Sequence, residues 1–348
     1  MSPASSQLSS NGIPARPINT YSTSSTSVTS SDRRNTVPAV DEPVNLHHME
    51  LLSHAILNRD LFNLGDNVAD DLFCISYGLE AAVASPYLLN QLLAFSARHL
   101  AFLNPDRYNH YIHQAVTLQT RAISLFNAAW RDSTVDKGNC VPVLLFSVVL
   151  GHHLLADSLT TRGSDDSLDA FLTHFVQGAE TNRGIYNVCS SAWPLLMESK
   201  LKAILSFSAG FTSRQPRGKD CQRVLELIDS PSLLCEEDKE ACRLATRYLQ
   251  VGFDALLADH GESGNNRYGM IFSWTMLVRP EFTALLTVKT PQALVVLAYY
   301  ALLLYNGREM WQVGNAGTYM LESIEQHLGP EWDYWIQYPL EMLGRGLE

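Results

Sequence analysis

The sequence predicts an all-α fold, with a single large multi-helix domain that follows a disordered N-terminal tail. Three observations carry this prediction. Of the 348 residues, 46% are hydrophobic and only 18% are charged, which is enough apolar material for a substantial core. Beyond residue 43 the apolar side chains recur with a period near 3.6, and the sustained alternation typical of strands is absent. We therefore divide the chain into a tail, residues 1–42, and a helical domain, residues 43–348.

The tail is dominated by Ser, Thr, Pro and Asn and contains almost no large apolar side chains. Such a segment cannot bury enough surface to offset the entropy lost when its backbone is ordered, so we predict that it is disordered. Thr36 follows Arg33 and Arg34 closely and is a phosphorylation candidate for a kinase that recognises basic residues before the acceptor. The alternative is a mildly basic stretch of solvated tail, because short motifs often match by chance.

The first helical segment raises the question of a metal site. In "VNLHHMELLSH", His47, Glu50 and His54 have helical spacings of three and four, so two imidazoles and a carboxylate share one helix face. Leu51 and Ala55 occupy the adjoining arc, as in an ordinary amphipathic helix with a polar edge. The H-E-x-x-H motif is absent. These observations favour a structural role, and we predict no metal site.

The segment "SPYLLNQLLAFSARHLAFLNP" shows the clearest helix boundaries. Ser85 suits an N-cap, and Pro86 suits the first helical position, where its missing N–H costs nothing. Leu and Phe side chains then follow the helical period until Asn104 and Pro105 end the run.

Two later segments have similar signals. Thr290 and Pro291 start a helix that Asn306 and Gly307 stop. The segment 235–257 begins with acidic residues, which favour the positive end of a helix dipole. Polar and Gly-rich breaks separate these and the other helical segments, at 133–140, 161–167, 213–220 and 260–269.

Signatures of catalysis are missing from the sequence. It has no G-x-S-x-G, G-x-G-x-x-G or G-x-x-x-x-G-K-[ST] motif and no C-x-x-C pair, so the spacing of Cys235 and Cys242 is best explained as coincidence. The pairs His110/His113 and His152/His153 are typical of surface or core-edge histidines. We predict that the protein is not an enzyme, with no catalytic residues and no cofactor.

Charge and hydropathy exclude further classes. The net charge is −11 with only 25 Lys and Arg residues, which disfavours stand-alone binding to polyanionic DNA. The longest apolar runs, residues 141–151 and 293–305, fall short of the ~20 residues that span a bilayer, so we predict no membrane span. The first forty residues contain no apolar segment of a secretory signal, and six scattered cysteines suggest reduced thiols in the cytosol or nucleus.

Several segments share a pattern with one protein family. Residues 46–56 read "LHHMELLSHAI", residues 183–185 read "RGI" and residues 291–304 read "PQALVVLAYYALLL". Trp311 follows, and the segment from Trp332 to Pro339 contains two tryptophans and two tyrosines. Between them, the positions of the motif "hPfLmhalLAlSAlHLA" and of the helix after it are matched by Pro86, Leu88, Leu92, Leu93, Ala94, Ser96, Ala97, His99, Leu100, Ala101, Pro105, Tyr111, Ala115, Gln119, Ala122 and Phe126. Taken in their order along the chain, these segments resemble the regulatory domain of fungal binuclear-zinc-cluster transcription factors of the sterol uptake control type. Tyr338 replaces the family's usual Trp before Pro339.

The resemblance covers residues 44–344 and implies an all-α regulatory domain that dimerises, holds an apolar ligand such as a sterol and controls transcription in the nucleus. Shuttling with the cytoplasm is left open. Family members carry a DNA-binding zinc cluster N-terminal to this domain, where this sequence has the Ser/Thr-rich tail. We therefore expect no direct DNA binding by this chain, and expect a homodimer or a heterodimer with a full-length zinc-cluster factor. A secondary-metabolite gene cluster and sterol homeostasis are both open as targets.

The aromatic C-terminal third supplies the candidates for a ligand pocket, because aromatic side chains combine large apolar area with one polar group. The alternative is that they fill the core. The candidates are Phe272, Trp274, Leu294, Leu297, Tyr300, Leu304, Trp311, Trp332 and Trp335. The leading functional hypothesis is a transcriptional regulator or co-regulator. The alternatives are a metal-dependent hydrolase that uses the helical histidines and an α-helical scaffold protein without a sensing role.

Overall fold

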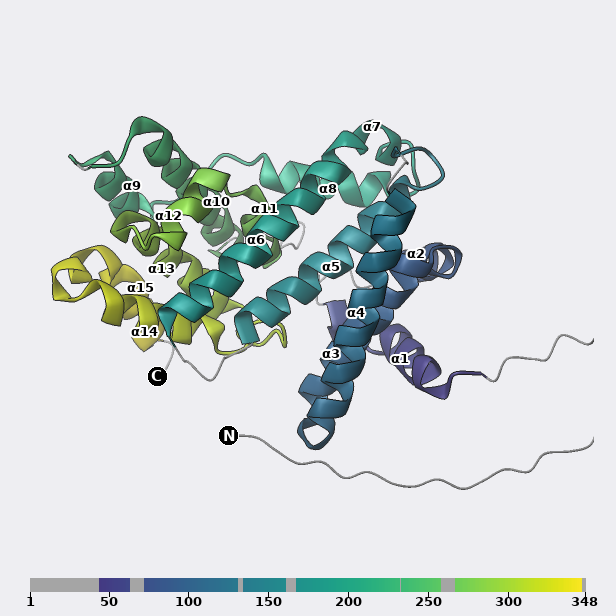
Figure 1. Cartoon of the computed structure of the whole chain (residues 1–348). Coiled ribbons are helices and arrows are strands. Elements are labelled where there is room, and N and C mark those ends of the chain that lie inside the picture. Colours follow the sequence, from purple (N-terminus) through teal and green to yellow (C-terminus); the bar gives the residue numbers. More distant parts are fainter. Residues whose placement is uncertain are drawn as a thin grey trace, which may run out of the picture. The chain divides into compact units, whose positions relative to one another are not determined.

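A computed structural model describes residues 44–62, 72–130, 134–160, 167–231, 233–257 and 267–345. Every regular element in these ranges is a helix, which confirms the predicted all-α fold (Figure 1). The tail predicted for residues 1–42, with Thr36, lies outside the described residues. Contacts divide the chain into two units, Met1–Val44 and Asn45–Glu348, and all the described helices belong to the second unit.

The helices of the second unit fall into two sequential groups. The first group is α1 (Leu46–Leu57), η1 (Arg59–Phe62), α2 (Leu72–Ala84), α3 (Pro86–Leu103), η2 (Pro105–Arg107), α4 (Tyr108–Trp130), α5 (Cys140–Thr160), α6 (Leu168–Ser191), α7 (Trp193–Leu196) and α8 (Lys202–Thr212). The second group is α9 (Gln222–Asp229), α10 (Glu236–Leu257), α11 (Gly269–Leu277), α12 (Pro280–Thr287), α13 (Pro291–Asn306), α14 (Ala316–Leu328), η3 (Pro330–Trp332) and α15 (Asp333–Arg345).

The ends of α3 lie where the sequence predicts them. Pro86 is the first helical residue and Ser85 is the N-cap, although the Ser85 hydroxyl does not cap the helix with a hydrogen bond. At the other end, Asn104 donates from both its backbone N–H and its side chain to the carbonyl of Leu100. Both groups thus use a terminal carbonyl that the helix itself leaves without a partner. The α3 helix packs along α4 and against α1 and α5 (Figure 1).

The most deeply buried helix is α13, which starts at Pro291 and ends before Gly307, as predicted. Every residue from Ala293 to Leu304 is buried. Helices α14, α15, α10 and α9 surround it, so it lacks a polar face. Lys289 precedes it in the left-handed region, with φ of 54°, and makes the turn out of α12.

The two largest of four apolar clusters among the described residues form the main cores of the unit. The C-terminal core gathers side chains of α6 and α9–α15 around α13, and the N-terminal core gathers side chains of α1–α5 around Phe95 and Phe146. Trp311, from the loop between α13 and α14, packs in the N-terminal core and donates its indole N–H to the carbonyl of Leu61 at 3.2 Å. Gln312 donates to the same carbonyl at 3.3 Å. This loop therefore joins segments about 250 residues apart.

The predicted family segment around Arg183 also holds helices together. From α6, the Arg183 guanidinium donates to the carbonyl of Val278 at 3.0 Å and to the hydroxyl of Thr283 at 3.3 Å. These bonds tie α6 to the start of α12 and to the two-residue connection between α11 and α12. Through these hydrogen bonds, Arg183 has a structural role in this segment.

Helix α5 is longer than its apolar run suggested. Its 21 residues are long and apolar enough to cross a membrane, and 61% of the most apolar window is buried inside the protein. The helices α12 and α13 pass the same test together, but they are bent by 105° at their junction. Buried core helices have this composition too, and α5 packs against α3 and α6.

Candidate functional site

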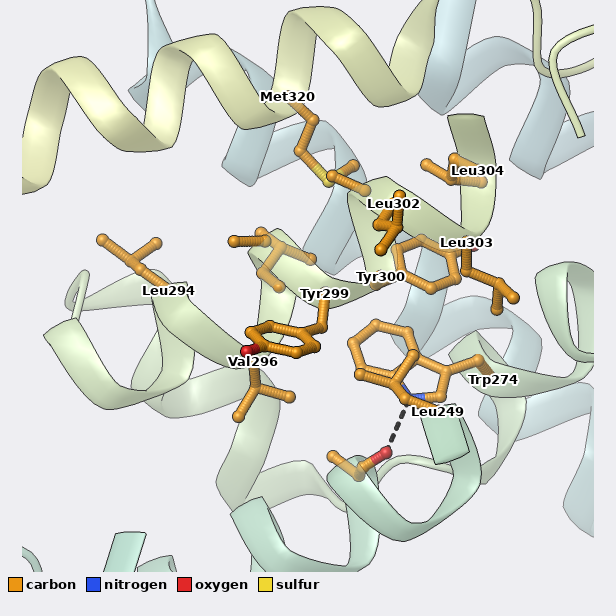
Figure 2. Packing of buried hydrophobic residues seen from close by; sticks show 14 of the residues in the cluster. Leu249, Trp274, Leu294, Val296, Tyr299, Tyr300, Leu302, Leu303, Leu304 and Met320 are labelled. Atoms are coloured by element: carbon orange, nitrogen blue, oxygen red, sulfur yellow. Dashed lines mark hydrogen bonds between the residues drawn. The ribbon is translucent and has the colours of Figure 1, made fainter. Parts of the chain in front are cut away.

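The predicted pocket residues on α11 and α13 pack tightly against one another. Trp274 and Tyr300 stack with ring centroids 4.3 Å apart and an interplanar angle of 16° (Figure 2). The Trp274 indole donates to the carbonyl of Ala245 at 3.0 Å, and the Tyr300 hydroxyl donates to the carbonyl of Ile271 at 2.8 Å. Both polar groups therefore have protein partners, and the rings lie in the core.

The other predicted pocket residues are distributed over both cores. Leu294, Leu297 and Leu304 are buried in the C-terminal core, as are Trp274 and Tyr300. Partly buried side chains at its periphery include Phe272, Trp332 and Trp335. Trp311 lies in the N-terminal core. Most of the predicted pocket residues therefore pack together in or around the C-terminal core, whereas Trp311 lies apart from them in the N-terminal core.

A pocket of about 390 Å³ opens on another side of the C-terminal core. Its lining comes from the loop before α9, from α9, from α13 and from α15, and we call it the tyrosine pocket. The lining residues are Lys219, Asp220, Gln222, Arg223, Glu226, Tyr299, Tyr334 and Tyr338.

Tyr299 is the most buried residue of the tyrosine pocket. It lies next to Tyr300 on α13, and Figure 2 shows its ring to one side of the Trp274–Tyr300 pair. Its side chain is fully buried, and its hydroxyl has no hydrogen-bond partner. Burial raises the pKa of Tyr299 well above the ordinary tyrosine value. The hydroxyl therefore stays protonated, and a buried donor without a partner is costly and rare.

Tyr338 and Asp220 form the adjoining wall. The Tyr338 ring stacks with Tyr299 at 5.9 Å and 22°, and its hydroxyl donates to an Asp220 carboxylate oxygen at 2.6 Å. The second Asp220 oxygen accepts from the side chain of Gln250 at 2.7 Å. Burial, followed by the hydrogen bond to Asp220, raises the pKa of Tyr338. Each oxygen of Asp220 therefore already has a donor.

Arg223 lies on α9 at the other wall of the pocket. Its guanidinium lies over the ring of Tyr334, 4.7 Å from the ring centroid, which is a cation–π contact. One terminal nitrogen donates to the carbonyl of Tyr334 at 3.1 Å and to the side-chain oxygen of Gln337 at 3.2 Å. These bonds fix the guanidinium beside the pocket through neutral partners.

A second pocket of about 320 Å³ lies where the start of α3, the end of α4 and the start of α5 meet. It is lined by Ala84, Ser85, Pro86, Tyr87, Leu125, Ala129, Gly138, Asn139 and Pro142. This lining contains no charged side chain. It offers few groups that could orient a ligand.

The three side chains of the N-terminal His/Glu face have separate partners. His54 shares a hydrogen bond of 3.2 Å with His99, and Glu50 accepts from the Tyr111 hydroxyl at 2.8 Å. The His47 ring lies 5.8 Å from that of His110. Within the described ranges, no group of three or more His, Cys, Asp or Glu side chains is placed to hold a metal ion.

His152 and His153 are buried more deeply than the core-edge position that the sequence suggested. Both lie on α5, which packs against α3, α6 and α11. His153 contacts the Gln91 side chain at 3.2 Å, and His152 packs against the ring of Phe272 at 4.2 Å. Burial lowers the pKa of each imidazole to about 4.

His110 and His113, in contrast, are exposed on α4. Of the two cysteines with the zinc-cluster spacing, Cys235 is exposed and Cys242 is buried, with a pKa raised by burial to about 12. A thiol of that kind stays protonated and is a poor metal ligand.

The residues of the tyrosine pocket could not be found as a group from the sequence. The segment "GKDCQR", which leads into the first residues of α9, lies far in sequence from the tyrosines near the C-terminus. Only the packing of α9, α13 and α15 brings them together. Searches for related proteins found neither a family model nor a curated protein that matches the chain. The site is therefore interpreted from its own geometry.

Proposed function

We propose that the protein is a transcriptional regulator or co-regulator that acts in the nucleus through protein partners and not through catalysis. The proposal takes its class from the resemblance to the regulatory domain of fungal zinc-cluster factors. It includes a homodimer, or a heterodimer with a full-length zinc-cluster factor that supplies the contacts to DNA.

The observation that most directly supports the regulatory proposal is that the family-like segments make contacts that hold the fold together. Arg183 of the "RGI" segment fastens α6 to α12, and Trp311 fastens the loop after α13 to Leu61. The segment that starts at Pro291 forms the central helix of the larger core. These contacts give the family-like segments structural roles, as the resemblance implies for segments that define a fold.

The proposed mode of action is a bias between conformations or oligomers. A small molecule or a partner changes such an equilibrium only if it binds one state better than the other. The tyrosine pocket is suited to this role because three helices and a loop meet there, so a ligand would contact α9, α13 and α15 at once.

A tethered reporter assay tests the regulatory role. The full chain is fused to a foreign DNA-binding domain, and transcription from a reporter that carries its binding site is measured. We expect a clear change, up or down, relative to the DNA-binding domain alone. A fusion carrying Gly317→Ala should lose the effect, because the added Cβ atom would clash with backbone atoms of α13 and disturb the packing of α14 against it. An unchanged reporter, with the wild-type fusion expressed and nuclear, would rule out the proposal.

Metal analysis of the purified chain tests the alternative of a metal-dependent hydrolase. The separate partners of His47, Glu50 and His54 give that alternative no support. We expect no stoichiometric zinc or iron. One equivalent of either metal, lost on replacing His54 by Gln, would favour the hydrolase over the regulator.

A further inference from the structure

We propose that the tyrosine pocket binds a small aromatic carboxylate, whose carboxylate accepts hydrogen bonds from the Tyr299 hydroxyl and the Arg223 guanidinium while its ring packs against Tyr334 and Tyr338. The inference concerns a binding site and does not depend on the proposed regulatory role.

The donors of the pocket are the first reason. The Tyr299 hydroxyl is buried and has no partner. Arg223 donates twice from one terminal nitrogen, and among the described residues its other terminal nitrogen and Nε have no partner. Lys219 makes no ion pair within the described part of the chain and lies at the exposed rim. Three lining residues therefore have a donor without a protein acceptor, and two of them are cationic.

The acceptors of the pocket are the second reason. Asp220 already receives hydrogen bonds from Tyr338 and Gln250, one on each oxygen. Glu226 is exposed at the rim, and its carboxylate accepts from the side chain of Gln222 at 3.2 Å. Because both oxygens of Asp220 already have donors and the deepest donor, the Tyr299 hydroxyl, has no acceptor, the pocket complements a ligand that accepts hydrogen bonds.

The charges that a ligand would meet are the third reason. The pocket is lined by two cationic residues, Lys219 and Arg223, and by two carboxylates, Asp220 and Glu226, so the formal charges balance. Their positions differ, because Arg223 is half-buried beside the tyrosines whereas Glu226 is in solvent. Solvent screens the exposed carboxylate more strongly than the half-buried guanidinium, and Asp220 is partly compensated by its two donors. A carboxylate next to Arg223 and Tyr299 is therefore favoured over an ammonium group.

Size and shape are the fourth reason. A volume of about 390 Å³ lies at the small end of ligand pockets, which suits a molecule of one or two rings. Tyr338 presents a ring stacked on Tyr299, and Tyr334 presents a ring under Arg223. Flat aromatic ligands pack well against such faces. A fully apolar ligand would instead leave the Tyr299 hydroxyl without a partner and would desolvate Arg223 at a cost.

Binding of benzoate and 2-naphthoate to the full chain, measured by calorimetry and thermal shift, tests the inference. Benzyl alcohol and benzylamine are the matched neutral and cationic probes. We expect saturable binding of at least one carboxylate at up to millimolar concentration, with at least about tenfold weaker binding of both other probes. Tyr299→Phe and Arg223→Gln should each weaken carboxylate binding by about tenfold or more.

Tyr300→Phe is the matched control, because it removes the hydroxyl of the neighbouring residue on the same helix. That hydroxyl donates to Ile271 in the core, so its loss should lower the melting temperature and leave carboxylate binding unchanged. Tyr299→Phe should have the opposite pattern, with an unchanged or higher melting temperature without ligand and with weaker binding.

Three outcomes would overturn the inference. They are an absence of saturable carboxylate binding to the folded wild-type chain, equal or tighter binding of benzyl alcohol or benzylamine, and carboxylate binding that is insensitive to both Tyr299→Phe and Arg223→Gln. A failure of this kind would leave the reporter result of the regulatory proposal untouched, so the two can be judged separately.

Discussion

Gly317 shows how one residue sets the distance between two helices. A Cβ atom built there would lie 2.5 Å from the Ala301 carbonyl oxygen and 2.6 Å from the Tyr305 backbone nitrogen. Because both contacts are with backbone atoms of α13, no side-chain rotation can relieve them. The close approach of α14 to α13 therefore requires glycine at this position.

Gly317→Ala should destabilise the protein by at least about 2 kcal/mol, because α14 must move away from α13 and disturb a tightly packed core. The measurement is the free energy of unfolding from chemical denaturation. Gly184→Ala is the control, since that glycine is exposed on α6 with nothing within 4 Å of the added atom. It should stabilise the protein by up to about 1 kcal/mol through helix propensity. Equal effects of the two substitutions would refute the close-approach explanation.

Trp311 illustrates a residue whose neighbours could not be inferred from its position in the sequence. It lies close to α13 in sequence but stacks on His99 of α3, with centroids 4.7 Å apart and an interplanar angle of 20°. We predicted Trp311 as a ligand-pocket residue because the C-terminal third of the sequence is rich in aromatic residues. The loop that carries it crosses to the N-terminal core, and residue periodicity contains no information about that crossing.

At the scale of elements, Trp311 and Gln312 anchor the loop between α13 and α14 to the N-terminal core through one carbonyl, that of Leu61. Trp311→Ala should cost about 3–5 kcal/mol of stability, because it leaves a large cavity in the N-terminal core. Trp311→Phe should cost much less, since Gln312 still donates to Leu61 and a ring still packs on His99. Unfolding monitored by circular dichroism gives both values. Similar losses for Phe and Ala would show that the hydrogen bond, and not the packing, matters most.

The ends of elements were the most predictable part of the fold. Pro86 and Pro291 begin helices because proline lacks only an N–H that the first turn does not use, and Gly307 follows the last residue of α13. These signals are local, so they act the same way in any fold. Cap hydrogen bonds were less predictable, because neither Ser85 nor Thr290 makes one with its side chain.

At the scale of the whole molecule, buried imidazoles make stability depend on pH. Burial lowers the pKa of His99, His152 and His153 to about 4, below the ordinary value of 6.5. Around them, His54 contacts His99, and the ion pair of Arg98 and Asp157 adjoins His153. The folded protein therefore holds these imidazoles neutral at pH values where the unfolded chain would protonate them.

The sign of the effect is set by proton linkage. The unfolded state binds more protons than the folded state between pH 6.5 and about 4, so stability is fully present above pH 6.5 and falls as the pH is lowered through this window. From about pH 7.5 to about pH 5, the loss should be about 2 kcal/mol for each histidine that titrates in this way. Denaturant unfolding at a series of pH values measures it.

His152→Phe isolates one of these contributions. The Nδ1 atom of His152 has no partner, and the ring packs against Phe272, so phenylalanine suits the site. The variant should show a shallower loss of stability than the wild-type protein as the pH falls from about 6.5 to about 5. Parallel curves for the two proteins would mean that His152 does not titrate as inferred.

The sequence by itself determined the all-α class, the starts and stops of α3 and α13, and which segments are apolar enough to be buried. These properties depend on interactions between residues a few positions apart, and the spacing of side chains along the chain is sufficient to reveal them. The same local information could not place Trp311 in the N-terminal core or separate Tyr299 from Tyr300. One of these adjacent tyrosines completes a core hydrogen bond, while the other lines a pocket with its hydroxyl unpartnered. Only the packing of α9 and α15 against α13 decides that difference, because it brings Asp220 and Arg223 to one side of the helix from a distant part of the chain.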